Sequence, residues 1–122
     1  MHTIAILALH GVVPFDLATP CEVFGRVRVP GVRDAYQLRV CGEARDIKAG
    51  AFDLRVQWDL SHLAGAQTVI VPGLNNPTMP IADDVLEALR AAATEGARVA
   101  SICSGAFVLA AAGLLDGRCR CR

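Results

Sequence analysis

Aromatic side chains are scarce in this chain: one Trp, one Tyr and four Phe make up 5% of its 122 residues. Its core must therefore be built from Ala, Val, Leu and Ile, and hydrophobic residues of all kinds reach 53%. Because only 20% of the residues are charged, the composition excludes a disordered or fibrous protein. It suits a parallel sheet of aliphatic strands covered by helices. The length allows one such domain and is too short for two.

The chain also lacks an excess of either charge, because 12 Lys and Arg residues balance 12 Asp and Glu residues. No basic cluster stands out before the last few residues, so the sequence offers no cationic face of the kind that nucleic-acid binding requires. No apolar stretch approaches the length of a membrane span. Residues 4–13 are apolar, but they lack the basic flank and cleavage site of a signal peptide. We expect this chain to contact neither DNA nor a membrane.

Signatures of metal sites and disulfides are missing as well. Five cysteines form an odd set without a Cys-x-x-Cys pair, and the three histidines do not cluster with them at ligand spacing. We therefore expect reduced thiols, a cytoplasmic protein, no metal site and no cofactor. The last four residues read CRCR, which has no logic in an α/β fold. We interpret residues 119–122 as an anomalous tail, produced by truncation or by a shifted reading frame.

Strands alternate with helices along the chain, which predicts βαβ units and a mainly parallel sheet. Strands are expected at residues 3–9, 36–42, 68–71 and 99–102, a small hairpin within 47–58, and helices at 16–27, 81–95 and 104–112. Pro20 is expected in the first turn of its helix, where its missing N–H does no harm. Gly96 is expected as the C-cap of the second helix.

The segment ASICSGAFVLAAAGLLDGR, residues 100–118, is the most informative one. An inner strand stops at Cys103 and a helix of small residues follows directly, so Cys103 is expected on a sharp turn with its side chain projecting, as in a nucleophile elbow. Gly105 leaves room for the helix to approach the strand, and a helix N-terminus favours a thiolate. Alternatively, Cys103 fills the buried end of a strand. The local pattern leaves both interpretations open.

Asp16 opens the first expected helix, at the carboxyl ends of the strands where open α/β sheets bind their ligands. A carboxyl group there can donate a hydrogen bond to a thiolate when protonated, or act as a general base when ionised. Asp16 is also a natural N-cap for its helix, a role that aspartate commonly fills. The residues alone favour the cap.

Three segments resemble, in order and spacing, the ThiJ/PfpI superfamily, whose fold is shared with class I glutamine amidotransferases. They are IAILALHGVVPFDLATPCEVFG (residues 4–25), TVIVPGLNNP (68–77) and the segment around Cys103. The last is most similar to the N-terminal domains of AraC-family transcriptional regulators. The resemblance covers nearly the whole chain and implies a three-layer, flavodoxin-like α/β sandwich over residues 1–118. We expect this domain to be truncated at its C-terminus, without the family's further strand and histidine-bearing segment, and without a helix-turn-helix domain.

The resemblance also implies a site. In the family an acidic residue at the position of Asp16 reaches the thiol at the position of Cys103, and both are our candidate catalytic residues. Backbone N–H groups of Gly73 and Ser104 would form an oxyanion hole beside the thiol. The family often has two glycines where this chain has Gly73-Leu74, and the leucine reduces the backbone freedom there. Gly73, Leu74 and Ser104 are the expected ligand-binding residues.

Two functions follow from this resemblance. The first is the ligand-sensing domain of an AraC-family regulator, which binds a small molecule near Cys103 and reaches DNA only through a C-terminal domain absent from this chain. The second is a cysteine-dependent hydrolase or hydratase resembling isonitrile hydratase, prompted by the DLATP sequence that begins at Asp16. Reversible oxidation of Cys103 is a third possibility. Because a shortened three-layer fold leaves apolar surface uncovered, we also expect a dimer or a larger oligomer.

Overall fold

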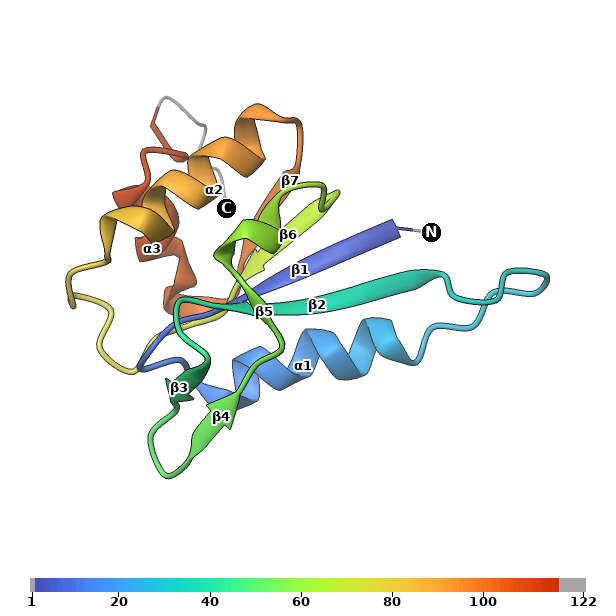
Figure 1. The fold of residues 1–122 in the computed structure, drawn as a ribbon, viewed down its shortest axis with the longest axis horizontal. Coiled ribbons are helices and arrows are strands. Elements are labelled where there is room, and N and C mark those ends of the chain that lie inside the picture. Colours follow the sequence, from blue (N-terminus) through green and yellow to red (C-terminus); the bar gives the residue numbers. More distant parts are fainter. Residues whose placement is uncertain (1, 117–122) are drawn as a thin grey trace.

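The computed structural model describes residues 2–116 and has a central sheet with α1 on one face and α2 and α3 on the other (Figure 1). The elements in chain order are β1 (His2–Ala8), α1 (Pro14–Gly25), β2 (Tyr36–Gly42), β3 (Asp46–Lys48), β4 (Asp53–Arg55), β5 (Trp58–Asp59), the 3-10 turn η1 (Leu60–Leu63), β6 (Thr68–Val71), α2 (Asp83–Thr94), β7 (Arg98–Ser101), the 3-10 turn η2 (Cys103–Gly105) and α3 (Ala106–Ala111). The anomalous tail predicted at residues 119–122 lies outside the described residues.

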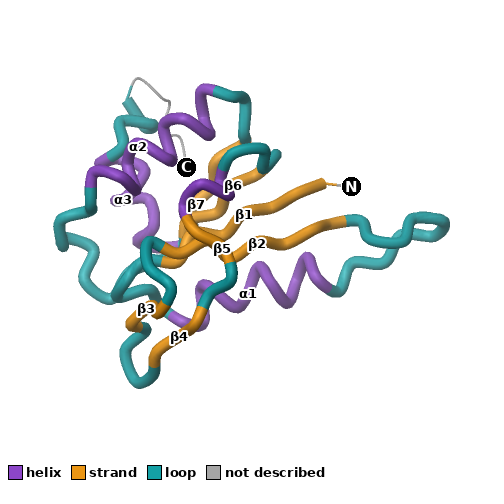
Figure 2. Tube along the Cα trace, in the orientation of Figure 1, coloured by secondary structure: helices purple, strands orange, loops and turns teal. Residues whose placement is uncertain are grey.

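The sheet has the strand order β5-β2-β1-β6-β7, and all of its neighbouring strands pair in parallel. Strands β3 and β4 form a separate antiparallel hairpin. Figure 2 shows this hairpin at the end of the sheet where β1 and β2 finish. This arrangement confirms the predicted three-layer, flavodoxin-like α/β fold.

Strand β1 runs through the centre of the core, and its side chains alternate between the two faces of the sheet. Ala5 and Leu7 pack in the cluster with the buried residues of α2 and α3. Ile4 and Ile6 pack with Leu17 of α1. A strand buried on both faces needs a continuous aliphatic run, which is the pattern that the sequence shows here.

Several boundaries differ from the predicted ones. Helix α1 begins at Pro14, two residues before the predicted start, so Pro20 lies inside the helix and the prediction that placed it in the first turn is wrong. The helix predicted at 104–112 begins instead as the turn η2 and continues as the six-residue α3. Gly96 follows the last turn of α2 with φ of 99°, the left-handed conformation expected after a helix end. Within the described residues no helix is long and apolar enough to cross a membrane.

Candidate functional site around Cys103

Cys103 has a φ of 52°, and it is the one non-glycine residue in the left-handed region among residues 2–116. Such a conformation costs free energy for a residue with a Cβ atom, and it is found most often at functional positions. The thiol is exposed, at the point where the chain leaves β7. The structure therefore has the predicted sharp turn with a projecting side chain, and it contradicts the alternative in which Cys103 fills a buried strand end.

Gly105 makes this turn possible. A Cβ atom on Gly105 would overlap the carbonyl oxygen of Val71 and lie 2.9 Å from that of Pro72. The N–H of Gly105 donates to the carbonyl of Ile102 at 2.9 Å, which closes the turn. The backbone after Cys103 thus packs directly against the end of β6, as the sequence predicts.

Gly73 is the meeting point of the predicted site residues. A Cβ atom on Gly73 would lie 2.6 Å from Oδ2 of Asp16, 3.0 Å from Oγ of Ser104 and 3.5 Å from Cβ of Cys103. These neighbours come from α1 and η2, far apart in the sequence, and both elements reach the loop after β6. The structure brings Asp16, Gly73, Cys103 and Ser104 together at one end of the sheet.

Asp16 lies in the first turn of α1, partly exposed, and is not the N-cap of that helix. The N-cap is Val13, whose N–H donates to the carbonyl of Gly73 at 2.9 Å. Because Val13 occupies the cap position, the carboxyl of Asp16 does not cap the helix, and it lies near Gly73 instead. Pro20 has no N–H to donate to the carbonyl of Asp16 one turn earlier, so the proline falls where it affects the backbone of a site residue.

The Ser104 hydroxyl holds the loop after β6 in place. It accepts from the N–H of Leu74 at 2.9 Å and donates to the carbonyl of Leu74 at 3.1 Å. The Leu74 side chain is buried in the core, which fixes the same peptide from its other side. The sequence predicts a role for the backbone N–H of Ser104 but not for its hydroxyl. A serine beside the cysteine gives no signal that its hydroxyl will bind the Leu74 peptide.

This arrangement decides which amides can reach a ligand. The N–H of Leu74 is occupied by Ser104. Within the described part of the chain, neither the N–H of Gly73 nor that of Ser104 donates a hydrogen bond. Two backbone donors beside Cys103 therefore remain free.

All three histidines of the chain have partners away from Cys103. Nε2 of His2 lies 2.8 Å from Oγ1 of Thr68, and Nδ1 of His10 accepts from the N–H of Lys48. His62 pairs with Asp59. Among residues 2–116 no group of three or more His, Cys, Asp or Glu side chains could hold a metal ion.

The described thiols differ in their environments, which predicts selective alkylation. Burial raises the pKa of Cys41 to about 11, and burial, with a smaller effect of Glu22, raises the pKa of Cys21. A thiol with a pKa near 11 is only about one thousandth ionised at pH 8, and the thiolate is the reactive species, so Cys41 should react slowly in the folded protein. In a variant with Cys119→Ser and Cys121→Ser, we expect iodoacetamide to modify Cys103 first and Cys41 only after unfolding.

Peptide mass spectrometry of time points checks this order. The rate at Cys41 should stay far below the rate at Cys103 in the folded protein, whereas unfolded protein should show similar rates at all three thiols. Equal labelling of Cys41 and Cys103 in the folded protein would contradict the structure.

Residues 2–120 match the DJ-1/PfpI family. The chain belongs to the DJ-1/PfpI family. It is 33% identical over 120 residues to an uncharacterized protein in the cpoL 5' region of Streptomyces lividans, covering 96% of this chain and 84% of that protein.

Solved structures share the fold of this DJ-1/PfpI domain. A two-domain protein from Anabaena variabilis, with DJ-1/ThiJ/PfpI-like and ferritin-like domains, superposes with a TM-score of 0.77 at 21% identity, over 96% of this chain and 34% of that one. An AraC family transcriptional regulator from Pseudomonas putida superposes with a TM-score of 0.73 at 17% identity, over 95% of this chain and 63% of that one. The domain thus spans less than two thirds of either chain.

Proposed function

We propose that this DJ-1/PfpI domain is a ligand-sensing domain of the kind found in AraC-family regulators, with a small molecule bound beside Cys103. One observation carries the proposal: the Asp16 carboxyl, the Ser104 hydroxyl and Cβ of Cys103 all surround Gly73. In this proposal any contact with DNA belongs to another domain, and self-association covers apolar surface that the domain leaves exposed.

The chemistry of these groups defines the ligand. The free N–H groups of Gly73 and Ser104 suit an acceptor oxygen, such as a carbonyl or carboxylate. The Asp16 carboxylate suits a cationic or hydrogen-bond-donating group. We therefore expect a small polar molecule that carries both an acceptor and a donor, with the thiol of Cys103 in contact between them.

Sensing is favoured over turnover because the site has few catalytic groups. The chain's histidines bond to other residues, and Asp16 is the acidic side chain that lies beside Gly73 together with Cys103. The grooves beside η1 and the hollow between β7 and α3 are lined by neither Cys103 nor Asp16. An enzyme that protects a covalent intermediate normally excludes water from it, whereas binding requires no such enclosure.

A cysteine-dependent hydratase is the second candidate, favoured by the two free amides beside the thiol. Asp16 would take the thiol proton of Cys103, the thiolate would add to an electrophilic carbon of a multiple bond, and Asp16 would return the proton to the neighbouring atom, which receives the displaced electron pair. Water would then attack the same carbon, and after proton transfers the carbon–sulfur bond would break and return the thiolate.

Ligand screening separates these functions. A small-molecule library is screened by thermal shift, and each hit is then measured by calorimetry on the Cys103→Ala and Asp16→Asn variants. We expect at least a tenfold loss of affinity in each, equivalent to about 1.4 kcal/mol. Asp83→Asn, an exposed aspartate in the first turn of another helix, serves as the matched control and should bind as the wild type does.

NMR of the ligand incubated with wild-type protein then distinguishes sensing from catalysis. A ligand that stays unchanged supports the sensor. A ligand that the wild type converts, but that stays unchanged with the Cys103→Ala variant, supports the hydratase. If hits bind both variants as tightly as they bind the wild type, neither function resides at this site.

A further inference from the structure

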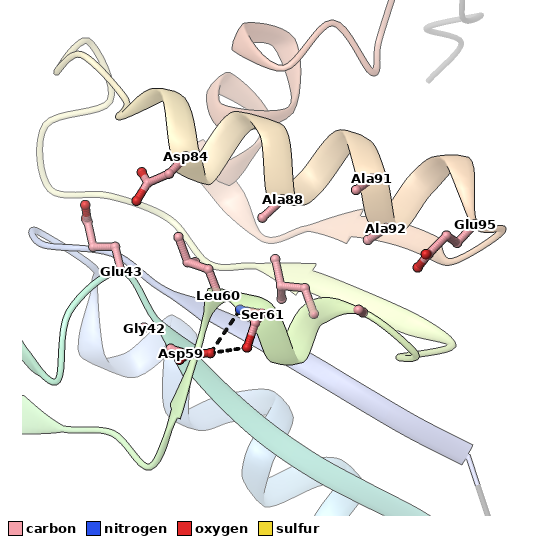
Figure 3. A pocket seen from close by; sticks show the side chains of 12 residues that line it. Gly42, Glu43, Asp59, Leu60, Ser61, Asp84, Ala88, Ala91, Ala92 and Glu95 are labelled. Carbon is pink, nitrogen blue, oxygen red and sulfur yellow. Dashed lines mark hydrogen bonds between the residues drawn. The ribbon is translucent and has the colours of Figure 1, made fainter.

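A groove of about 450 Å³ lies between α2 and η1, and none of the site residues around Cys103 lines it. Figure 3 shows α2 along one wall, with Ala88 and Ala92 on the side that faces η1, and Ala91 also lines the groove. The buried Leu63 belongs to that opposite wall. Ala92 and Leu63 are buried in the same core cluster at the base of the groove, while Ala88 is partly exposed and Ala91 is exposed.

All ionisable side chains that line this groove are acidic. They are Glu43, Asp59, Asp84 and Glu95. The chain as a whole is neutral, so this is a local concentration of negative charge. Figure 3 shows Glu43 and Asp84 at one end of the groove and Glu95 at the other.

Two of the carboxylates, those of Asp59 and Glu43, are held in place by hydrogen bonds. Asp59 accepts hydrogen bonds from the N–H of Ser61 and from His62, and these bonds lower the pKa of its carboxyl. Glu43 accepts from the N–H of His10 at 2.9 Å. An occupant of the groove therefore meets apolar walls with negative charge at both ends.

We propose that this groove binds a basic amphipathic helix of a partner protein. Asp84 and Glu95 are eleven positions apart on α2, a separation of about 16 Å at 1.5 Å per residue. A partner helix lying along α2 would place Lys or Arg residues eleven positions apart on one face, since eleven residues make about three turns. Between these cations, Leu or Ile side chains would fill the space left by the alanines, as in other helix-in-groove complexes.

Charge complementarity and shape together favour a helix over a small cation. An isolated amine satisfies the carboxylates but leaves the accessible apolar surface of Leu60, Ala88 and Ala91 in contact with water. A segment with aliphatic side chains between two cations buries those walls as well. The proposal is independent of the function proposed for Cys103.

The first test uses a fluorescein-labelled synthetic helical peptide with Leu and Ala on one face and Lys at two positions eleven apart. By fluorescence anisotropy with the full chain, we expect it to bind at least tenfold more tightly than the same peptide with both Lys replaced by Glu. Binding should weaken as salt rises, because exposed charges are screened. Failure to bind the basic peptide at all would overturn the proposal.

The second test changes the protein. Asp84→Asn with Glu95→Gln should weaken the basic peptide at least fivefold, and Ala91→Leu should block it by filling the groove. The matched control is Asp83→Asn with Glu87→Gln, a pair on the same helix outside the groove lining, which should leave binding unchanged. Circular dichroism confirms that each variant folds.

Other outcomes would contradict the proposal. Equal weakening by the control pair would show binding to the general charge of α2 rather than to the groove. Unchanged binding in Ala91→Leu would show that the apolar walls are not used. Spermine that binds as tightly as the peptide, and with the same sensitivity to Asp84→Asn and Glu95→Gln, would assign the groove to small polyamines.

Discussion

Replacing Gly105 by alanine is expected to lower the free energy of unfolding by about 3 kcal/mol or more, a large part of the stability of a small domain. The added Cβ would overlap the carbonyl oxygen of Val71 and crowd that of Pro72. Both are backbone atoms at the end of a central strand, so neither can move without disturbing the sheet. The substitution should also displace the turn that carries Cys103.

Urea denaturation followed by circular dichroism measures this effect. Gly25→Ala is the matched control, because it adds the same methyl group at the end of α1, where the nearest atom is Cδ1 of Leu38 at 3.5 Å. That contact is an ordinary one, so Gly25→Ala should leave stability unchanged or raise it slightly. If Gly105→Ala were as stable as Gly25→Ala, the close packing of the turn against β6 would be wrong.

The sheet could be predicted because its strands carry their own signal. Residues 68–71 are mostly aliphatic and residues 36–40 alternate apolar and polar side chains, and both strands have the predicted limits. Elements that depend on tertiary contacts gave no such signal. Strand β5 has two residues and is defined only by pairing with β2, and η1 is a single turn capped by Asp59. Neither is long enough to show a hydrophobic period.

The start of α1 was misplaced for a physical reason. Aspartate is a common N-cap, so Asp16 indicated a helix that begins there. The structure instead caps α1 with Val13, which has no side-chain oxygen, and uses Pro14 in the first turn. The Val13 N–H bonds to Gly73 across the site, a contact that no local pattern reveals. The same contact leaves the Asp16 carboxyl available to the site.

The family resemblance predicted which site residues meet, but not how the loop between them is held. The pairing of Ser104 with both polar groups of the Leu74 peptide depends on the register of two segments thirty residues apart. The acidic groove between α2 and η1 was also beyond prediction, because its carboxylates come from four separate places in the sequence. Single carboxylates of this kind look like ordinary surface residues until the fold brings them together.

Gly73→Ala is expected to abolish ligand binding at the Cys103 site while costing little stability. The new Cβ would lie 2.6 Å from Oδ2 of Asp16 and 3.0 Å from Oγ of Ser104. The carboxyl is the free end of a partly exposed side chain, so it can swing away and the loss of stability should stay near 1 kcal/mol. The site then holds a methyl group where the ligand and the carboxyl should meet, and affinity should fall at least tenfold.

A double-mutant cycle tests whether the carboxyl is the cause. In an Asp16→Ala background the methyl group of Gly73→Ala gains the space that the carboxyl occupied, so its cost in unfolding free energy should fall by about 0.5 kcal/mol or more. Residual crowding against Ser104 remains in both backgrounds and cancels from the comparison. Strict additivity of the two substitutions would mean that the Asp16 carboxyl does not lie against Gly73. The ligand site proposed beside Cys103 would then lack its acidic group, which is one of the observations that support a binding role there.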